Sequence, residues 1–341
     1  MLKELAVIVS IFLSQLNIPF TGKDLTGSVL GSSDSHKLFS FQEEPEIDIP
    51  LSGGARGEFS VNSTHPQPPP KRGLTNGNQL YLAPALLQIR ASDDNNLKIS
   101  ARSAITMNVE TGDIVYEKNI RKKLPVASLT KLMTALLAIE KIGNLNEQIT
   151  ISRNAVLTEG NSGNLKVGEK ITAENLLRLL LVNSSNDAAV ALAEYISGSE
   201  KQFVGLMNEK AKTLELKNTH FANSTGLDEE GNYSTVYDLV KLTKNILSEP
   251  PLLEIMRIQN SDVFSADGAN VHHLRNTNKL LGKLPSVNII GGKTGFTDQA
   301  GECLILITSH PENDQKIISV ILGSEDRFGE MKKLVNYSLI N

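Results

Sequence analysis

Regular hydrophobic patterning is confined to residues 97–341 of this 341-residue chain, and this restricts the folded domain to that part. Residues 21 to about 80 are rich in Ser, Gly, Asn and Pro, with a proline tract at residues 65–70, and show no sustained period of 2 or 3.6. Such a segment buries too little apolar surface to offset the entropy of ordering it. We therefore predict a disordered linker over residues 21–96, in which the apolar run 81–89 is either linker or a short segment docked on the domain.

The first twenty residues contain a nine-residue apolar stretch, residues 5–13, just after Lys3. A stretch of this length is too short to span a bilayer comfortably and is typical of the apolar region of a signal peptide. Glu4 offsets the charge of Lys3 and no Ala-x-Ala site follows, so cleavage stays open. We predict a signal peptide or membrane anchor over residues 1–20, and therefore an exported protein that is secreted or attached to the membrane through residues 5–20.

The composition argues against several classes of function. A net charge of −4, an aromatic content of 5% and the absence of Trp argue against nucleic acid as a partner. The single cysteine, Cys303, rules out an intramolecular disulfide and a multi-cysteine metal site, and its apolar neighbours predict a buried, unreactive thiol. The adjacent His272 and His273 lack the spacing of metal ligands, so we place both in a loop or on the surface and expect no metal or cofactor.

The order of the predicted elements indicates the fold class. Two alternating segments, 104–109 and 114–117, flank a turn and predict a β-hairpin. Further strands are predicted at 287–290, 302–309 and 316–323. Helices are predicted at 129–142, 173–182, 188–196 and 328–339. One more helix is predicted to begin after a capping box at 235–238. Strands at both ends with helices between them predict an α/β (α+β) fold. In it, an antiparallel sheet built from both ends of the domain is covered by helices, with a helical subdomain.

Three short motifs carry residues that could do chemistry, and the first is Ser128-Leu-Thr-Lys131 at the start of the long apolar helix. Residues i and i+3 share a helix face with Cβ atoms about 5–6 Å apart, so the Lys131 amine can reach the Ser128 hydroxyl. A serine needs a base to become a nucleophile, and a lysine needs burial or a second cation to lower its pKa from about 10.4. Taken alone, an N-cap serine with a solvated lysine explains this pattern more simply.

The second motif, Ser184-Ser-Asn186, lies in a polar break between two apolar helices. In a functional interpretation, a second hydroxyl relays a proton to the leaving group and an amide holds the substrate backbone. Helix capping by Ser184 or Asn186 is the structural alternative.

The third motif is Gly291-Gly-Lys-Thr-Gly295. A nucleotide-binding P-loop is excluded because Val287 stands where that motif needs a glycine. Glycines around a lysine in strand-like sequence favour an edge strand on which another backbone lies closely, with Lys293 and Thr294 holding a carboxylate. A tight turn is the alternative.

The order of these three motifs is that of the penicillin-recognising serine enzymes. Over residues 97–341 the chain resembles the D-alanyl-D-alanine carboxypeptidases, the small penicillin-binding proteins. The segments that carry the resemblance are 124–135, 183–189, 223–228, 233–235 and 293–301. It implies a β-lactamase/transpeptidase-like fold and a serine-type carboxypeptidase over residues 97–341. The enzyme would remove the terminal D-alanine from peptidoglycan stem peptides through an acyl-enzyme, and would bind β-lactams.

The resemblance also implies a role for each residue. Ser128 attacks the carbonyl carbon and Lys131 takes its proton, while Ser184 passes a proton to the departing D-alanine and Asn186 holds the acyl side. The substrate-binding residues are Lys293, Thr294, Gly295 and Phe296: the first two bind the terminal carboxylate. The N–H groups of Ser128 and Phe296 form an oxyanion hole, worth about 3–4 kcal/mol per donor.

Two departures from the family pattern and three alternatives remain. Ser185 replaces a more usual glycine, and Leu339 nearly ends a chain whose relatives often continue into a β-rich domain and an amphipathic anchor.

A D,D-endopeptidase would use the same residues. A class A-like β-lactamase needs a deacylating Glu, for which residues 249–254 are the nearest candidate but lack the expected Asn. A non-catalytic β-lactam-sensing or wall-binding module is an alternative of another class.

Overall fold

The computed structural model describes residues 97–310 and 312–340, so the predicted leader at 1–20 and linker at 21–96 lie outside the described residues. The strands are β1 Ser103–Asn108, β2 Ile114–Lys118, β3 Gln148–Thr150, β4 Lys170–Thr172, β5 Asn260–Phe264, β6 Val271–Arg275, β7 Asn288–Thr297, β8 Gly301–Ser309 and β9 Lys316–Ser324. The helices are the 3-10 turn η2 Ala127–Thr130, α3 Lys131–Lys141, α4 Arg153–Val156, α5 Ala173–Leu181, α6 Asn186–Ser197, α7 Glu200–Thr213, α8 Val236–Ile246, α9 Pro250–Arg257 and α10 Arg327–Ile340.

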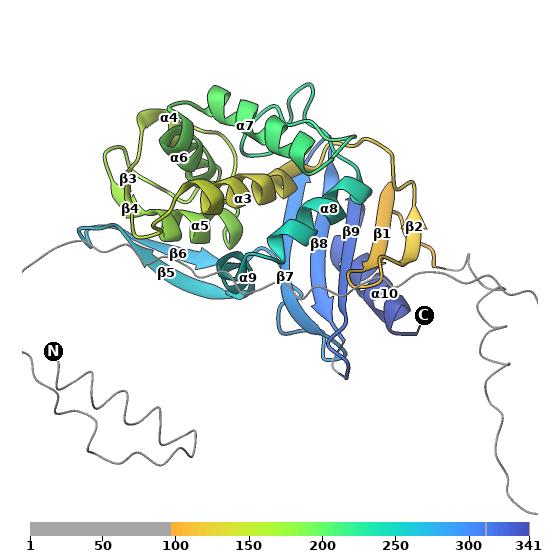
Figure 1. The fold of residues 1–341 in the computed structure, drawn as a ribbon. Coiled ribbons are helices and arrows are strands. Elements are labelled where there is room, and N and C mark those ends of the chain that lie inside the picture. Colours follow the sequence, from red (N-terminus) through yellow and green to blue (C-terminus); the bar gives the residue numbers. More distant parts are fainter. Residues whose placement is uncertain (1–96, 311, 341) are drawn as a thin grey trace, which may run out of the picture. The chain divides into compact units, whose positions relative to one another are not determined.

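A five-stranded antiparallel sheet joins the two ends of the domain, in the order β2-β1-β9-β8-β7 (Figure 1). The hairpin β1–β2 pairs through β1 with β9, where Ile105 lies opposite Val320. The predicted antiparallel sheet built from both ends is therefore confirmed. Among the residues that the structure describes, this arrangement leaves β7, which carries the third motif, paired on one side only.

Both faces of the central strands are covered, which explains why β8 is a continuous apolar run instead of an alternating one. Successive side chains of a strand point to opposite faces. Leu304 and Leu306 accordingly pack in the cluster that contains α10, whereas Ile305 and Ile307 pack in the cluster formed with the other helices. The predicted C-terminal helix is confirmed as α10, lying behind the sheet in Figure 1.

Helices α3 to α7 form the predicted helical subdomain beside β7, whereas α8 packs on β9 and β1 and covers the other face of the sheet (Figure 1). Helix α3 is its central element, because every residue from Lys131 to Ala138 is buried. Helices α5, α6 and α7 pack around it. The active-site candidates lie where this subdomain meets the open edge of the sheet.

The predicted capping box at the start of α8 forms only in part. The Thr235 hydroxyl accepts a hydrogen bond from the Asp238 N–H at 3.1 Å, as expected for an N-cap. The Asp238 carboxylate instead accepts from the N–H of Asn218 at 2.7 Å, and so anchors the preceding loop. Within residues 97–310 and 312–340, no helix combines the length and the hydropathy needed to cross a membrane.

Candidate active site

The first motif lies at the junction of η2 and α3. The sequence predicts a helix from Leu129, but residues 127–130 form a 3-10 turn, so Ser128 stands on this turn and Lys131 begins the α-helix. The Lys131 amine lies 2.9 Å from the Ser128 hydroxyl. The turn starts at Ala127, whose φ of 50° is left-handed, and its carbonyl abuts Gly226. Tertiary packing therefore sets the conformation that brings the hydroxyl and the amine together.

Lys131 is fully buried and is held from three directions. Besides Ser128, its amine donates to the Asn186 side-chain oxygen and to the Thr225 carbonyl, both at 2.6 Å. Burial, and then the nearby Lys293 ammonium, lower the pKa of Lys131 well below its usual range, while Asp187 acts in the opposite sense. A lysine of this kind is neutral more readily than one in water and can accept a proton. The alternative of a solvated Lys131 is excluded.

The second motif connects α5 to α6 and faces the first motif. Ser184 is buried with a left-handed φ of 62°, and its hydroxyl accepts from the Lys293 amine at 2.7 Å. Asn186 donates its side-chain N–H to the Glu159 carbonyl at 2.6 Å, with its oxygen on Lys131. Neither residue caps α6, because the N-cap is Ser185, whose side chain makes no capping hydrogen bond. The capping interpretation is therefore wrong.

The third motif lies within the edge strand β7, as the strand interpretation predicts, and not in a tight turn. Gly295 is required by a close approach: a Cβ there would lie 3.0 Å from the Val126 oxygen and 3.1 Å from the Ser128 nitrogen. The strand can therefore lie directly against the turn that carries Ser128. Phe296 follows with 58% of its surface exposed, at the mouth of the site.

Lys293 is the second buried amine of the site. Burial, and then the Arg327 guanidinium, lower its pKa to about 7. Its amine also donates to the Thr294 carbonyl at 2.9 Å. The Thr294 hydroxyl donates to that of Thr277 at 2.7 Å, which orients it at the edge of the strand. A cationic amine beside a hydroxyl can bind a carboxylate.

Several residues that complete the site lie outside the three motifs. Thr225 and Glu159 act through backbone carbonyls, which every residue has, so no sequence signal marks them. Thr277 also lies outside the motifs. Arg327 donates to the Gly295 carbonyl at 2.6 Å and pairs with Glu302 at 3.3 Å. Thr225 does lie in the segment 223–228, one of those that resemble the carboxypeptidases.

Two predictions outside the motifs can be compared with the structure. Cys303 is buried and burial raises the pKa of its thiol to about 11, which confirms the unreactive thiol. The placement of His272 was wrong: both histidines lie on β6, where His273 is exposed but His272 is buried. Among the residues that the structure describes, no three of His, Cys, Asp and Glu are grouped to hold a metal ion.

A cavity of about 630 Å³ opens beside the three motifs. Its lining includes Thr225, Glu159 and Phe296, which connect it to the first, second and third motifs respectively. A peptide bound at the motifs would have room to continue into it.

The comparisons with known proteins agree with this geometry. A family model described as D-alanyl-D-alanine carboxypeptidase matches residues 89–326. The chain belongs to this family. Among its relatives, the D-alanyl-D-alanine carboxypeptidase DacF of Bacillus subtilis is 35% identical over 251 residues, which cover 72% of this chain and 63% of DacF.

Other members of the D-alanyl-D-alanine carboxypeptidase family match as well. A D-alanyl-D-alanine endopeptidase of Escherichia coli is 31% identical over 235 residues, covering 68% of this chain and 73% of that protein. The structure of penicillin-binding protein 6B of Escherichia coli aligns with a TM-score of 0.63 and 33% identity over 70% of this chain and 77% of the other. The expected transpeptidase-like fold is thus confirmed. The chain spans between 61% and 64% of the length of the first three carboxypeptidase relatives that it matches.

Proposed function

We propose that this protein is a serine-type D-alanyl-D-alanine carboxypeptidase that removes the terminal D-alanine of peptidoglycan stem peptides and is acylated by β-lactams. The observation that carries the proposal is the buried Lys131 amine, 2.9 Å from the Ser128 hydroxyl, with a lowered pKa. A hydroxyl beside an amine that can be neutral at working pH has the base it needs to become a nucleophile.

Acylation begins when Lys131 takes the Ser128 proton and the Ser128 oxygen attacks the carbonyl carbon of the D-Ala-D-Ala bond. The close approach of Gly295 to the Ser128 nitrogen supports an oxyanion hole formed by the N–H groups of Ser128 and Phe296. As the C–N bond breaks, the proton that Lys131 took from Ser128 passes to the leaving nitrogen through Ser184, which bonds to Lys293. Lys131 is neutral again, and D-alanine departs with a neutral amine that takes a further proton from water.

The leaving group is recognised through its carboxylate. Lys293 supplies a positive charge and Thr294 a hydroxyl, which Thr277 orients. Asn186, fixed by Lys131 and by the Glu159 carbonyl, holds the acyl side. Water then attacks the ester and releases the shortened peptide, and Ser128 regains its proton. In a β-lactam the leaving amine stays tethered to the acyl group after ring opening, which slows the attack of water.

The alternatives differ in how well the geometry supports them. A D,D-endopeptidase would use the same residues, and one relative bears that name. The β-lactamase alternative is disfavoured because Glu254 lies exposed on α9 and, among the described residues, makes no hydrogen bond to the three motifs. A non-catalytic wall-binding module is disfavoured because the amine and hydroxyl needed for reaction are already in contact, whereas a β-lactam sensor would also be acylated and differs in not cleaving peptide.

The proposed substrate sets the proposed location and organisation. Peptidoglycan lies outside the cytoplasm, so we infer export directed by residues 1–20, with membrane attachment, where it occurs, through residues 5–20. Residues 21–96 would link this segment to a catalytic domain over 97–341.

The test compares the full chain with Ser128→Ala on three substrates: a peptide ending in D-Ala-D-Ala, a cross-linked peptide dimer and a fluorescent penicillin. Free D-alanine together with a stable label, both lost in Ser128→Ala, supports the carboxypeptidase. Faster cleavage of the dimer indicates an endopeptidase, and rapid penicillin turnover a lactamase. Labelling without any peptide cleavage would identify a sensor and contradict the proposal.

A further inference from the structure

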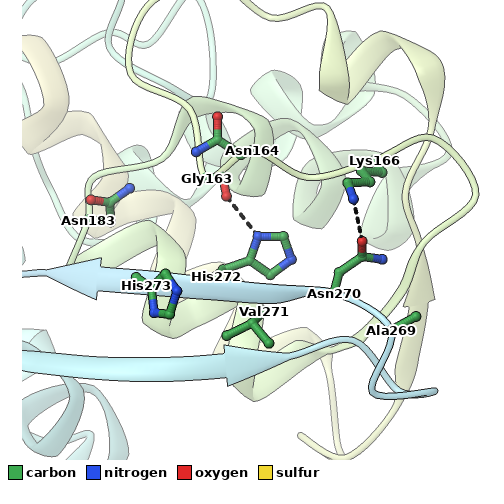
Figure 2. Close-up of a pocket in the computed structure, with 9 residues that line it drawn as sticks. All are labelled: Gly163, Asn164, Lys166, Asn183, Ala269, Asn270, Val271, His272 and His273. Atoms are coloured by element: carbon green, nitrogen blue, oxygen red, sulfur yellow. Dashed lines mark hydrogen bonds between the residues drawn. The ribbon is translucent and has the colours of Figure 1, made fainter.

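His272 is a buried titratable side chain that the proposed mechanism does not use. Only 4% of it is exposed, and each ring nitrogen contacts an oxygen: Nδ1 is 2.9 Å from the Gly163 carbonyl, and Nε2 is 2.7 Å from the Glu169 carboxylate (the bond to Gly163 is drawn in Figure 2). The Glu169 side chain is itself 1% exposed. The next residue, His273, has 79% of its side chain exposed and pairs with Asp262.

The hydrogen bonds fix where the protons of this pair must be. A carbonyl only accepts, so Nδ1 of His272 carries a hydrogen. The second carboxylate oxygen of Glu169 accepts from the Lys166 N–H at 2.9 Å. A hydrogen bond between Nε2 of His272 and the first carboxylate oxygen of Glu169 needs one more proton, which lies either on the ring or on the carboxyl group. The pair is neutral as a unit, and removal of either member leaves the other buried without its partner.

The pair bridges two segments beside a polar cavity of about 310 Å³, and Figure 2 shows His272 among the residues that line this cavity. One is the loop 159–169, which supplies Gly163 and Glu169, and the other is the hairpin β5–β6. Among the described residues, two further hydrogen bonds join this loop and the adjoining Lys170 to the hairpin, from Lys166 to Asn270 and from Ala266 to Lys170. All four residues of these bonds are at least partly exposed. Within the part of the chain that the structure describes, the contacts of His272 are therefore the buried hydrogen-bonded link between the two segments.

The loop side of this link leads to the second motif. Asn186 donates its backbone N–H to the Asn161 carbonyl at 2.7 Å and its side-chain N–H to the Glu159 carbonyl at 2.6 Å. The Asp187 carboxylate accepts from the Gly163 N–H at 2.9 Å. A shift of the loop therefore moves the acceptors that orient Asn186.

The hairpin side leads to the carboxylate-binding end of the site. Strand β6 ends at Arg275, and the chain then leads to Thr277, whose N–H donates to the Val182 carbonyl at 3.1 Å and whose hydroxyl accepts from that of Thr294. The two segments thus support opposite walls of the cleft, the second motif and the third.

We propose that His272 is a positioning residue for the acylation reaction. Together with Glu169 it ties the loop that holds Asn186 to the strand that leads to Thr277, and so fixes the two walls of the cleft relative to each other. This inference rests on the proposed function, because it assigns the effect to the rate at which Ser128 is acylated. Neither side chain touches substrate.

The test uses the full chain with His272→Ala, Glu169→Ala, Glu169→Gln and, as the matched control, His273→Ala. The end point of labelling by a fluorescent penicillin counts the active sites, and the second-order rate constant is expressed per counted site. We expect it to fall at least tenfold in both His272→Ala and Glu169→Ala. Glu169→Gln should stay within threefold of wild type, because the amide can accept from Lys166 and donate to a neutral His272. His273→Ala should leave it unchanged.

A merely structural role would lower the number of active sites and the Tm but not the rate constant per site. Rate constants within twofold of wild type in both alanine variants would therefore overturn the proposal. Hydrogen exchange gives a second measurement that needs no activity: in Glu169→Ala, segments 159–165 and 183–187 should exchange at least tenfold faster, with α10 unchanged. Unchanged exchange there would also overturn it. A wild-type chain that takes no label would instead count against the proposed function.

Discussion

At the scale of single residues, the proposed mechanism depends on two buried amines that need opposite charge states. In this mechanism Lys131 must be neutral to take the proton of Ser128, whereas Lys293 must be charged to bind a carboxylate. Burial lowers the pKa of both, and the positive charge of Lys293 lowers that of Lys131 further. Each amine therefore limits the reaction on one side of the pH scale.

We predict a bell-shaped pH profile for acylation. The rate constant should rise with pH as Lys131 loses its proton, and fall as Lys293 loses its own, with the descending limb near pH 7 because the pKa of Lys293 is lowered to about 7. The pH dependence of the second-order rate constant of acylation by a fluorescent penicillin reports the pKa values of the free enzyme. A rate that still rises above pH 9 would contradict the assignment of Lys293 as the cation.

Arg327 should control the position of the descending limb. Its guanidinium is the second cause, after burial, of the lowered pKa of Lys293. Removing a nearby positive charge favours the ammonium form, so Arg327→Gln should move the descending limb upward by about 0.5–1 pH unit. The variant also loses the hydrogen bond to the Gly295 carbonyl, which can change the maximum rate. The quantity to compare is therefore the pH of the descending limb. A limb at the wild-type pH would show that Arg327 does not act on Lys293 by charge.

At the scale of elements, the reactive turn η2 is shaped by a neighbouring loop. Gly226 has a φ of 85°, and a Cβ on it would overlap the carbonyl oxygen of Ala127. The loop that supplies the Thr225 acceptor is therefore packed directly against the turn that carries Ser128.

We predict that Gly226→Ala lowers the free energy of unfolding by about 2 kcal/mol or more and slows acylation at least tenfold. Strain at the left-handed φ and the overlap with Ala127 both contribute. The matched control is Gly205→Ala on α7, where an added Cβ meets nothing within 4 Å; it should stabilise by about 0.5–1 kcal/mol. Urea unfolding and the acylation rate check both variants, and an unaffected Gly226→Ala would contradict the packing described.

The elements that could be predicted from the sequence are those that bury apolar surface. Strands β8 and β9 and helices α3, α5 and α6 follow hydrophobic runs, and their predicted bounds differ from the observed ones by at most two residues. The 3-10 turn under Ser128 could not be predicted, because its conformation comes from contact with Gly226 far along the chain. His272 is buried because side chains alternate along β6, and the polar His272-His273 pair in the sequence does not indicate which of the two faces inward.

Within the site, the contributing side chains could be predicted from the sequence, but the contributing backbone groups could not. Ser128, Ser184 and Lys293 lie in recognisable motifs, and the structure brings them together. The carbonyl oxygens of Thr225 and Glu159 complete the network around Lys131 and Asn186, and no residue type marks such a contribution.

At the scale of the whole molecule, the site lies between the open edge of the sheet and the helical subdomain. Its residues come from η2 and α3, from the connection between α5 and α6 with the first residue of α6, and from β7, so neither half contains the site alone. All of them lie within the described residues.

We therefore predict that a fragment of residues 97–341 acylates at the rate of the full chain, within about twofold, because the contacts of the site lie among residues 97–310 and 312–340. The acylation rate per labelled site and the Tm of the two proteins provide the comparison. A fragment that folds but reacts tenfold more slowly would show that residues 1–96 contribute to catalysis.

The central claim is that the Ser128 oxygen becomes covalently acylated, and peptide mapping of the penicillin-treated protein by mass spectrometry tests it most directly. One penicilloyl group per chain, on the peptide that contains Ser128 and absent from Ser128→Ala, is the predicted result. An adduct on Ser184 instead, or an unmodified wild-type chain under conditions that label a known penicillin-binding protein, would contradict the account.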